Sequence, residues 1–185
     1  MHAFLVSTGL VALAEIGDRT QLLALMLAAR FRRPWPIVFG ILIATLANHA
    51  GAGIAGMLLG SLLSGEWLRW IVGISFLAMA VWALFPDRHD AGDGVLSRGG
   101  ALVTTIVVFF LVEIGDKTQI ATIGLAARFE QLYAVVLGTT LGMMLANIPV
   151  VILGDRLAGK LPLRAIRCAA ALVFAVLGVV TIVVA

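Results

Sequence analysis

The chain has 185 residues, of which 62% are hydrophobic and 12% are charged, and its formal net charge is +3. Soluble domains carry roughly 25% charged residues to cover their surface, so this composition excludes an ordinary soluble protein and indicates a surface that mostly faces lipid. The basic residues lie in short segments between apolar runs rather than on one face, which argues against a nucleic-acid-binding protein.

Six apolar runs follow one another along the chain, and each has about the 20 residues that a helix needs to cross ~30 Å of hydrocarbon. They extend over residues 4–29, 36–63, 67–85, 101–127, 133–153 and 163–184. We expect the first run to stay in the mature protein, because no basic residue precedes it and Glu15, Asp18 and Arg19 interrupt it. The single cysteine, Cys168, lies in the last run and is expected to serve packing. The sequence predicts an all-α membrane protein with six transmembrane helices.

The basic residues are distributed unevenly between the two sets of loops. Arg69 and Arg128 are the two that follow the second and fourth runs. Nine others follow the first, third and fifth runs, namely Arg30, Arg32, Arg33, Arg88, Arg98, Arg156, Lys160, Arg164 and Arg167. Loops rich in Lys and Arg stay in the cytoplasm, so this pattern predicts that both termini lie outside.

The two halves of the chain repeat one another. The segment Glu-Ile-Gly-Asp-Arg-Thr-Gln at residues 15–21 returns with Lys for Arg at residues 113–119, an offset of 98 residues. The same offset aligns residues 28–31 with 126–129 and Gly40 with Gly138, and one inserted residue then aligns Asn48 with Asn147. We interpret residues 1–86 and 101–185 as copies of one three-helix unit, joined by a polar cytoplasmic linker at residues 87–100. Three spans per copy give the copies opposite orientations, an inverted repeat typical of secondary transporters with a substrate site at the membrane midplane.

The acidic residues of the two motifs lie in the middle of predicted spans. A charge at the centre of a membrane helix costs at least ~2.5 kcal/mol on insertion scales, and such residues are usually functional. On a continuous helix Glu15, Asp18 and Gln21 would share one face, and Glu113, Asp116 and Gln119 would do the same in the second copy. Gly17 and Gly115 lie within these stretches and favour local unwinding that frees backbone carbonyls.

Further oxygen donors accompany the acids. Asn48 and Asn147 supply amide oxygens, and Thr20 and Thr118 supply hydroxyls. A site of carboxylate, amide and carbonyl oxygens suits a hard divalent cation such as Ca²⁺ or Mn²⁺, disfavours zinc and copper, and ranks Mg²⁺ lower because it sheds water reluctantly.

The remaining polar residues of the spans leave alternatives open. Arg19 and Lys117, four residues after the glutamates, are expected to offset part of the acid charge when no metal is bound and to be released when the metal arrives. The motifs could instead form a polar network that fixes helix packing. His49 is either a ligand or proton carrier or a histidine hydrogen-bonded between helices, and its counterpart is Ile148. Met143 and Met144 either bind the metal through their thioether sulfurs or only fill space between the packed helices.

Small residues spaced four apart mark two of the runs. They are Ala52, Gly56 and Gly60 in the second run and Gly138 and Gly142 in the fifth. This spacing predicts close helix packing between or within the halves, and it also offers faces for an oligomer.

The paired motif resembles the signature of the manganese/calcium cation exchanger family of bacteria, the Golgi and chloroplasts, in which Glu-x-Gly-Asp-(Lys/Arg)-(Thr/Ser) occurs twice. Both copies match at every defined position, and the resemblance covers nearly the whole chain. It implies secondary transport of Mn²⁺, or in some members Ca²⁺, out of the cytosol in exchange for protons, with the motif acids as the metal site and no prosthetic group. The short linker and the lack of an N-terminal extension fit a compact form in a bacterial inner membrane.

We therefore predict an antiporter with alternating access rather than an enzyme. Glu15, Asp18, Glu113 and Asp116 bind the ion and take up protons once it leaves, and the motif glutamines and the two asparagines complete or support the shell. The sequence has no nucleotide-binding Gly-rich loop, no Ser/His pair and no His-Glu-x-x-His motif. Two rivals are an exporter of small cationic organic solutes such as basic amino acids, and a membrane scaffold that transports nothing.

Overall fold

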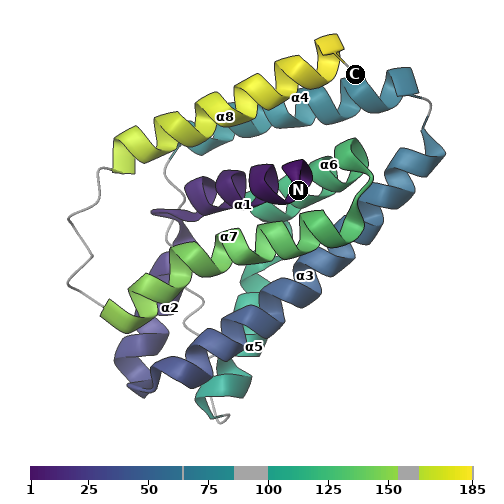
Figure 1. Cartoon of the computed structure of the whole chain (residues 1–185). Coiled ribbons are helices and arrows are strands. Elements are labelled where there is room, and N and C mark those ends of the chain that lie inside the picture. The colour runs from purple at the N-terminus through teal and green to yellow at the C-terminus, as the bar shows by residue number, and fades with distance from the viewer. Residues whose placement is uncertain (64, 86–99, 154–162, 185) are drawn as a thin grey trace.

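The computed structural model describes residues 1–63, 65–85, 100–153 and 163–184, and these residues form helices with no strand among them (Figure 1). The helices are α1 (His2–Glu15), α2 (Arg19–Phe31), α3 (Pro34–Leu62), α4 (Gly65–Leu84), α5 (Ala101–Glu113), α6 (Lys117–Phe129), α7 (Leu132–Leu153) and α8 (Leu163–Val184). The predicted linker lies outside the described residues except for Gly100, as do Arg88, Arg98, Arg156 and Lys160.

The first and fourth predicted spans are each divided into two helices. The first divides between Glu15 and Arg19, and the fourth between Glu113 and Lys117. Gly17 has φ 83° and Gly115 has φ 75°, a left-handed conformation that strains a residue with a Cβ atom. The prediction of a continuous helix with one acid-lined face is therefore wrong at both motifs, and the expected unwinding at the glycines is what the structure has.

Four helices in the described part of the chain are long and apolar enough to cross a membrane, namely α3, α4, α7 and α8. The apolar helices α1 and α5 have 14 and 13 residues. At 1.5 Å per residue neither spans ~30 Å of hydrocarbon alone. The interruption of the two motif-bearing runs is thus the reason why six predicted spans appear as eight helices.

The helices gather around two separate apolar cores. One core is built from α1, α4, α6, α8 and the start of α7 and includes Leu10, Phe76 and Phe174. The other is built from α2, α5 and parts of α3 and α7 and includes Leu27 and Phe109. The chain passes from one core to the other at each interrupted motif, since α1 leads into α2 and α5 leads into α6. Both breaks therefore lie between the cores.

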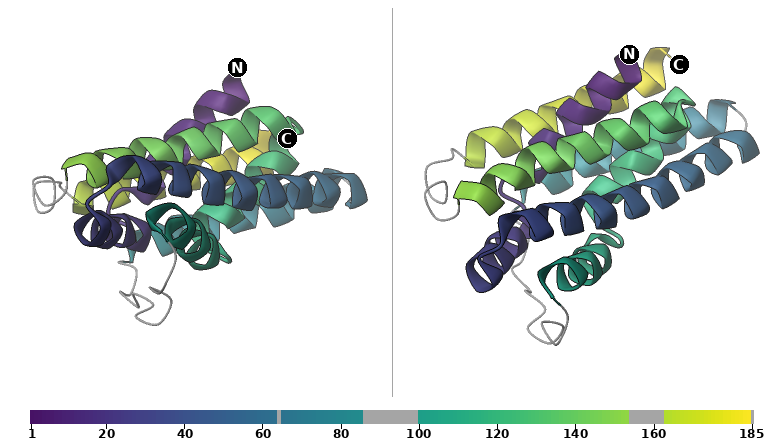
Figure 2. Two further views of the ribbon diagram at one scale, coloured as in Figure 1. Left: turned by 90° about the horizontal axis from the view of Figure 1, so that it is seen from below. Right: turned by 60° about the horizontal axis from the view of Figure 1, so that its bottom comes forward.

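Helices from different halves pack side by side. Helix α1 packs along α7, α3 packs along α5, and α4 packs along α8. The α4/α8 pair lies at one edge of the molecule (Figure 1). Figure 2 shows α2 and α5 side by side near α3. The α4/α8 pair rests on α6 and α1, the helices of the first core.

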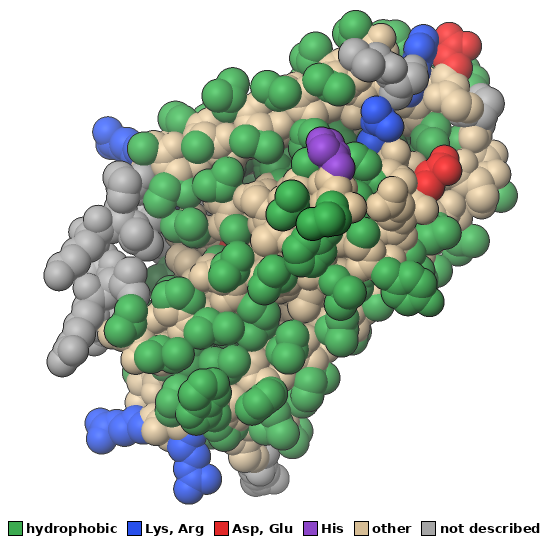
Figure 3. Space-filling model, viewed as in Figure 1, with side chains coloured by type: hydrophobic (Ala, Val, Ile, Leu, Met, Phe, Trp, Pro, Cys, Tyr) green, Lys and Arg blue, Asp and Glu red, His purple; other side chains and the backbone are tan. Residues whose placement is uncertain are grey.

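The surface has the polarity of a membrane-embedded protein. Large apolar side chains are exposed along the helices, for example Ile43 at 47%, Leu145 at 54% and Val183 at 71%. On the face in Figure 3 these green side chains cover the middle, and charged side chains lie towards the ends. Lipid is the solvent that makes such an apolar surface stable.

Glycines let the helices of the two halves approach closely. A Cβ atom on Gly56 would meet the carbonyl of Ile123 in α6, and one on Gly142 would lie 2.6 Å from the carbonyl oxygen of Thr8 in α1. Gly40 packs on Thr105 in the same way. The predicted close packing of small residues is confirmed for these faces, and it joins helices of one chain. Assembly into an oligomer stays a prediction.

A pair of glycine substitutions tests this packing. In Gly138→Leu the new Cβ would lie 2.6 Å from the carbonyl oxygen of Phe4, whereas Gly9 in α1 has no neighbouring atom within 4 Å of its Cβ position. Overpacking typically costs about 1–3 kcal/mol, so Gly138→Leu should unfold at a lower temperature in detergent than the wild type. Gly9→Leu is the control and should unfold close to it. Equal unfolding temperatures for the two variants would contradict the packing.

Candidate cation site

Each interrupted helix restarts at an aspartate of the motif. Asp18 is the N-cap of α2, and its Oδ1 accepts a hydrogen bond of 2.7 Å from the backbone N–H of Arg19. Asp116 is the N-cap of α6 and makes no side-chain cap bond. Aspartate is a favoured N-cap because its carboxylate offsets the unpaired N–H groups of the first turn. The motif Asp thus begins the second helix of each pair and holds its carboxylate at the break.

The motif glutamines brace the breaks. The Oε1 atom of Gln21 accepts from the backbone N–H of Gly17 at 2.8 Å, and that of Gln119 accepts from Gly115 at 2.7 Å. Gln21 also donates to the carbonyl of Ala146 in α7 at 2.9 Å. We expected these amide oxygens to complete or support the metal shell. In the structure they accept hydrogen bonds from the left-handed glycines and stabilise them.

Three carboxylates from the two motifs meet between the breaks. One carboxylate oxygen each of Glu15, Asp18 and Asp116 lies within 4.8 Å of the others, and all three side chains are buried. Glu113 is buried too, but it is not part of this group. Its oxygens accept hydrogen bonds from Thr45 Oγ1 at 2.9 Å and from Asn48 Nδ2 at 3.2 Å. The structure thus unites three of the four predicted acids and attaches the fourth to α3.

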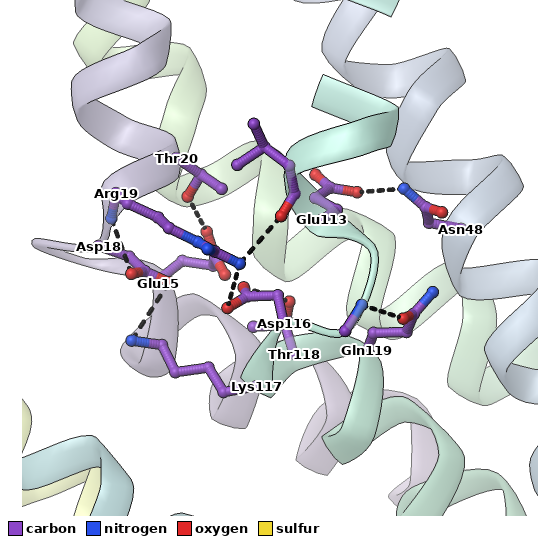
Figure 4. A network of polar contacts seen from close by, with 12 residues as sticks. Glu15, Asp18, Arg19, Thr20, Asn48, Glu113, Asp116, Lys117, Thr118 and Gln119 are labelled. Atoms are coloured by element: carbon purple, nitrogen blue, oxygen red, sulfur yellow. Dashed lines mark hydrogen bonds and ion pairs between the residues drawn. The ribbon is translucent and has the colours of Figure 1, made fainter. Parts of the chain in front are cut away.

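The basic residues of the motifs cross over to the opposite half. Lys117 Nζ lies 3.2 Å from Asp18 Oδ2, and Arg19 Nη2 lies 3.2 Å from Asp116 Oδ1 (Figure 4). Arg19 Nη2 also donates to the carbonyl of Val112 at 2.9 Å. Both bases thus offset acid charge as expected, but the ion pairs are with the aspartates of the opposite half and not with the glutamates four residues earlier. Pairing at that spacing needs a continuous helix, and each break lies between the two residues.

The motif threonines contact carboxylates. Thr20 Oγ1 donates to Glu15 Oε2 at 2.6 Å, and Thr118 Oγ1 lies 3.4 Å from Asp116 Oδ2. Both hydroxyls therefore help to orient the acids.

The remaining predicted residues occupy α3 and α7. Asn147 Nδ2 donates to the backbone carbonyl and the sulfur of Met143, each at 3.1 Å, and its buried Oδ1 has no hydrogen-bond partner in the described part of the chain. His49 is buried, and neither ring nitrogen has a hydrogen-bond partner among the described residues. Met144 is buried in the second core. These positions leave a metal role for His49, Met143 and Met144 without a contact to support it.

Sequence reasoning missed two groups that touch the motifs. Thr45 lies three residues before Asn48 on α3, so helical spacing could have placed both side chains on the face that holds Glu113. The carbonyl of Val112, which accepts from Arg19, is one of the last in α5. It is available because the last four carbonyls of a helix lack partners within it, but only the position of the break identifies it.

The assembled donors define a class of protein. Three buried carboxylates with hydroxyl and carbonyl neighbours suit a hard divalent cation, and they offer neither thiolate nor imidazole contacts. Interrupted helices that hold charged groups within apolar surroundings are typical of membrane transporters for ions. The chain is an integral membrane protein with the make-up of a cation transporter.

Comparison with known proteins gives the family. The chain belongs to the GDT1 family of divalent cation/proton antiporters, whose model matches residues 3–91 and 101–185. A protein of Vibrio cholerae named "Putative manganese exporter" is 48% identical over 98% of this chain and 90% of its own length. The "Divalent cation/proton antiporter GDT1" of Saccharomyces cerevisiae is 24% identical over 94% of this chain and 81% of its own. The "GDT1-like protein 4" of Arabidopsis thaliana is 26% identical over 97% and 94%. No solved structure matches.

The left-handed glycine of the second motif gives a test of the break. Gly115→Ala adds a Cβ where no atom lies within 4 Å, so strain at φ 75° is the expected defect, roughly 1–2 kcal/mol. We expect the variant to unfold at a lower temperature and to bind divalent cations more weakly, as measured by calorimetry in detergent. Gly100→Ala is the matched control, since Gly100 is also open but has φ −62°. Wild-type behaviour of Gly115→Ala would show that the break does not need glycine.

Proposed function

We propose that this chain exports Mn²⁺ from the cytosol in exchange for protons, and that the cargo binds where Glu15, Asp18 and Asp116 meet. The observation that carries the proposal is the approach of three buried carboxylates from both halves to within 4.8 Å of one another. The two bases on the aspartates offset only part of the charge that three ionised carboxylates carry, so the group still attracts a divalent cation. Membership of the antiporter family and the name of the Vibrio cholerae relative support this choice of cargo.

The donor set also ranks the cargo ions. Hard oxygen ligands suit Mn²⁺ and Ca²⁺ and disfavour zinc and copper, and Mg²⁺ ranks below both because it holds its water. Asn147 supplies a further donor, because its Oδ1 is buried and has no hydrogen-bond partner in the described ranges. Beside the group, the carboxylate of Glu113 accepts a proton, and Asn48 and Thr45 hold that carboxylate by hydrogen bonds.

We propose further that residues 1–86 and 101–185 are inverted repeats with three membrane spans each, the first span of each being the interrupted pair α1/α2 or α5/α6. Three features support this: the family model matches in two stretches, α1 packs on α7 as α3 packs on α5, and both breaks carry a left-handed glycine. The α4/α8 pair rests mainly on α1 and α6 rather than on their counterparts α5 and α2, so the two halves are not equivalent in this arrangement. In the alternative state of an alternating-access cycle, each half would take up the contacts that the other half has here.

The topology that we propose has both termini outside a bacterial inner membrane, because most basic residues follow the first, third and fifth apolar runs. Arg33, between α2 and α3, and Gln131, between α6 and α7, are exposed and lie on opposite sides in this topology. After Cys168 is replaced by Ser, a membrane-impermeant thiol reagent added to intact cells should react with a single cysteine at one of these two positions, and should reach the other only once the membrane is opened. Gln131 should be labelled from outside. Labelling of both positions from one side would remove the inverted repeat.

Transport itself is tested with purified protein in liposomes. With the interior made acidic, Mn²⁺ added outside should enter while the internal pH rises, because metal and protons compete for the same carboxylates. Ca²⁺, Mg²⁺ and Zn²⁺ are tested in turn to rank the cargo. Glu15→Gln and Glu113→Gln should each reduce Mn²⁺ entry to the level of empty liposomes.

Glu66→Gln is the matched control for these variants, since the Glu66 side chain is 76% exposed at the start of α4, and it should transport as the wild type does. If Mn²⁺ entered without proton movement, the protein would be a uniporter and not an antiporter. Full activity of Glu15→Gln would place the cargo site elsewhere in the chain.

A further inference from the structure

The two basic residues of the motifs lie on the carboxylates that the cargo would use. Lys117 contacts Asp18 and Arg19 contacts Asp116, each at 3.2 Å. Both aspartates belong to the group of three carboxylates. Building on the proposed function, we propose that Lys117 and Arg19 are built-in counter-cations, which hold the empty site together and which a divalent ion displaces from the aspartates.

The two ion pairs are largely buried, so the charges in them act strongly on a cation bound nearby. The side chain of Lys117 is 8% exposed, and Asp18 and Asp116 are each 1% exposed. Charges enclosed in this way are weakly screened by salt and water, so a cation next to them changes the affinity for a second cation. Arg19 is 37% exposed and therefore the more screened of the two.

The charges compensate one another only in part. When ionised, the three carboxylates carry three negative charges, and Lys117 and Arg19 carry two positive ones. One negative charge remains to attract a divalent ion, and the two fixed cations repel it. The counter-cations should therefore lower the affinity of the site and speed the release of its cargo, and they keep the empty group from being three uncompensated buried charges.

Arg19 has a second partner that keeps it at the site. Its Nη2 donates to the carbonyl of Val112 near the end of α5, at 2.9 Å. When the cargo takes Asp116, the guanidinium can stay bonded to this carbonyl and return when the ion leaves. Because each base pairs with the aspartate of the other half, the two ion pairs also link the halves when the site is empty. A bound ion replaces these ion pairs with its own bonds to the same aspartates.

Neutral and charge-preserving variants separate this role from a purely structural one. Lys117→Gln and Arg19→Gln should each bind Mn²⁺ about tenfold more tightly or better than the wild type, because a repelling charge has been removed. Both should exchange Mn²⁺ more slowly in liposomes, since release is impaired. Lys117→Arg and Arg19→Lys, which keep the positive charge and place in each half the base that the other half carries, should show no gain in Mn²⁺ affinity over the wild type. Affinity is measured by calorimetry in detergent, on protein whose folding is checked by its unfolding temperature.

The outcomes are distinct. If wild-type protein neither binds nor transports Mn²⁺, the proposed function fails. If the wild type binds and transports Mn²⁺ but Lys117→Gln and Arg19→Gln bind it equally or less tightly, the counter-cation role is overturned and the bases serve packing alone. Should Lys117→Gln fail to fold, the more exposed Arg19→Gln decides the question by the same criterion.

Discussion

Acidic side chains are buried in the apolar interior of this membrane protein, and the cost of burying their charge is the constraint on which the other features depend. Isolated charges there are costly, so the molecule gathers Glu15, Asp18 and Asp116 and gives the aspartates basic partners. The acids reach one another only because each motif leaves the helix at a glycine. The two breaks, their glutamine braces and the division into two cores follow from this arrangement.

Much of this could be predicted from the sequence, because the patterns that carry it are local. The apolar runs predicted the helices, and Gly17 and Gly115 marked where unwinding occurs. The 98-residue offset predicted a duplication. Small residues such as Gly56 and Gly142 predicted close packing between helices, which the structure has. In each case the residue type decides the outcome with little dependence on distant neighbours.

The misses concern long-range geometry. Spacing of four residues predicted that Arg19 and Lys117 would face the glutamates, but a break makes that spacing meaningless and lets each base reach an aspartate about a hundred residues away. Similarly, Gln21 and Gln119 were predicted as ligands, although a left-handed glycine leaves an N–H that their side chains satisfy. The separation of Glu113 from the other acids depends on Thr45 and Asn48 of α3, and no local pattern in the motif itself contains that information.

The central claim is that one divalent cation binds between the two breaks, and locating the ion tests it most directly. Anomalous X-ray scattering at the manganese edge, from crystals grown with Mn²⁺, should give one strong peak bounded by carboxylate oxygens of Glu15, Asp18 and Asp116. The side chains of Arg19 and Lys117 should have moved off the aspartates. A peak elsewhere, with the two ion pairs intact and no density between the breaks, would contradict this account.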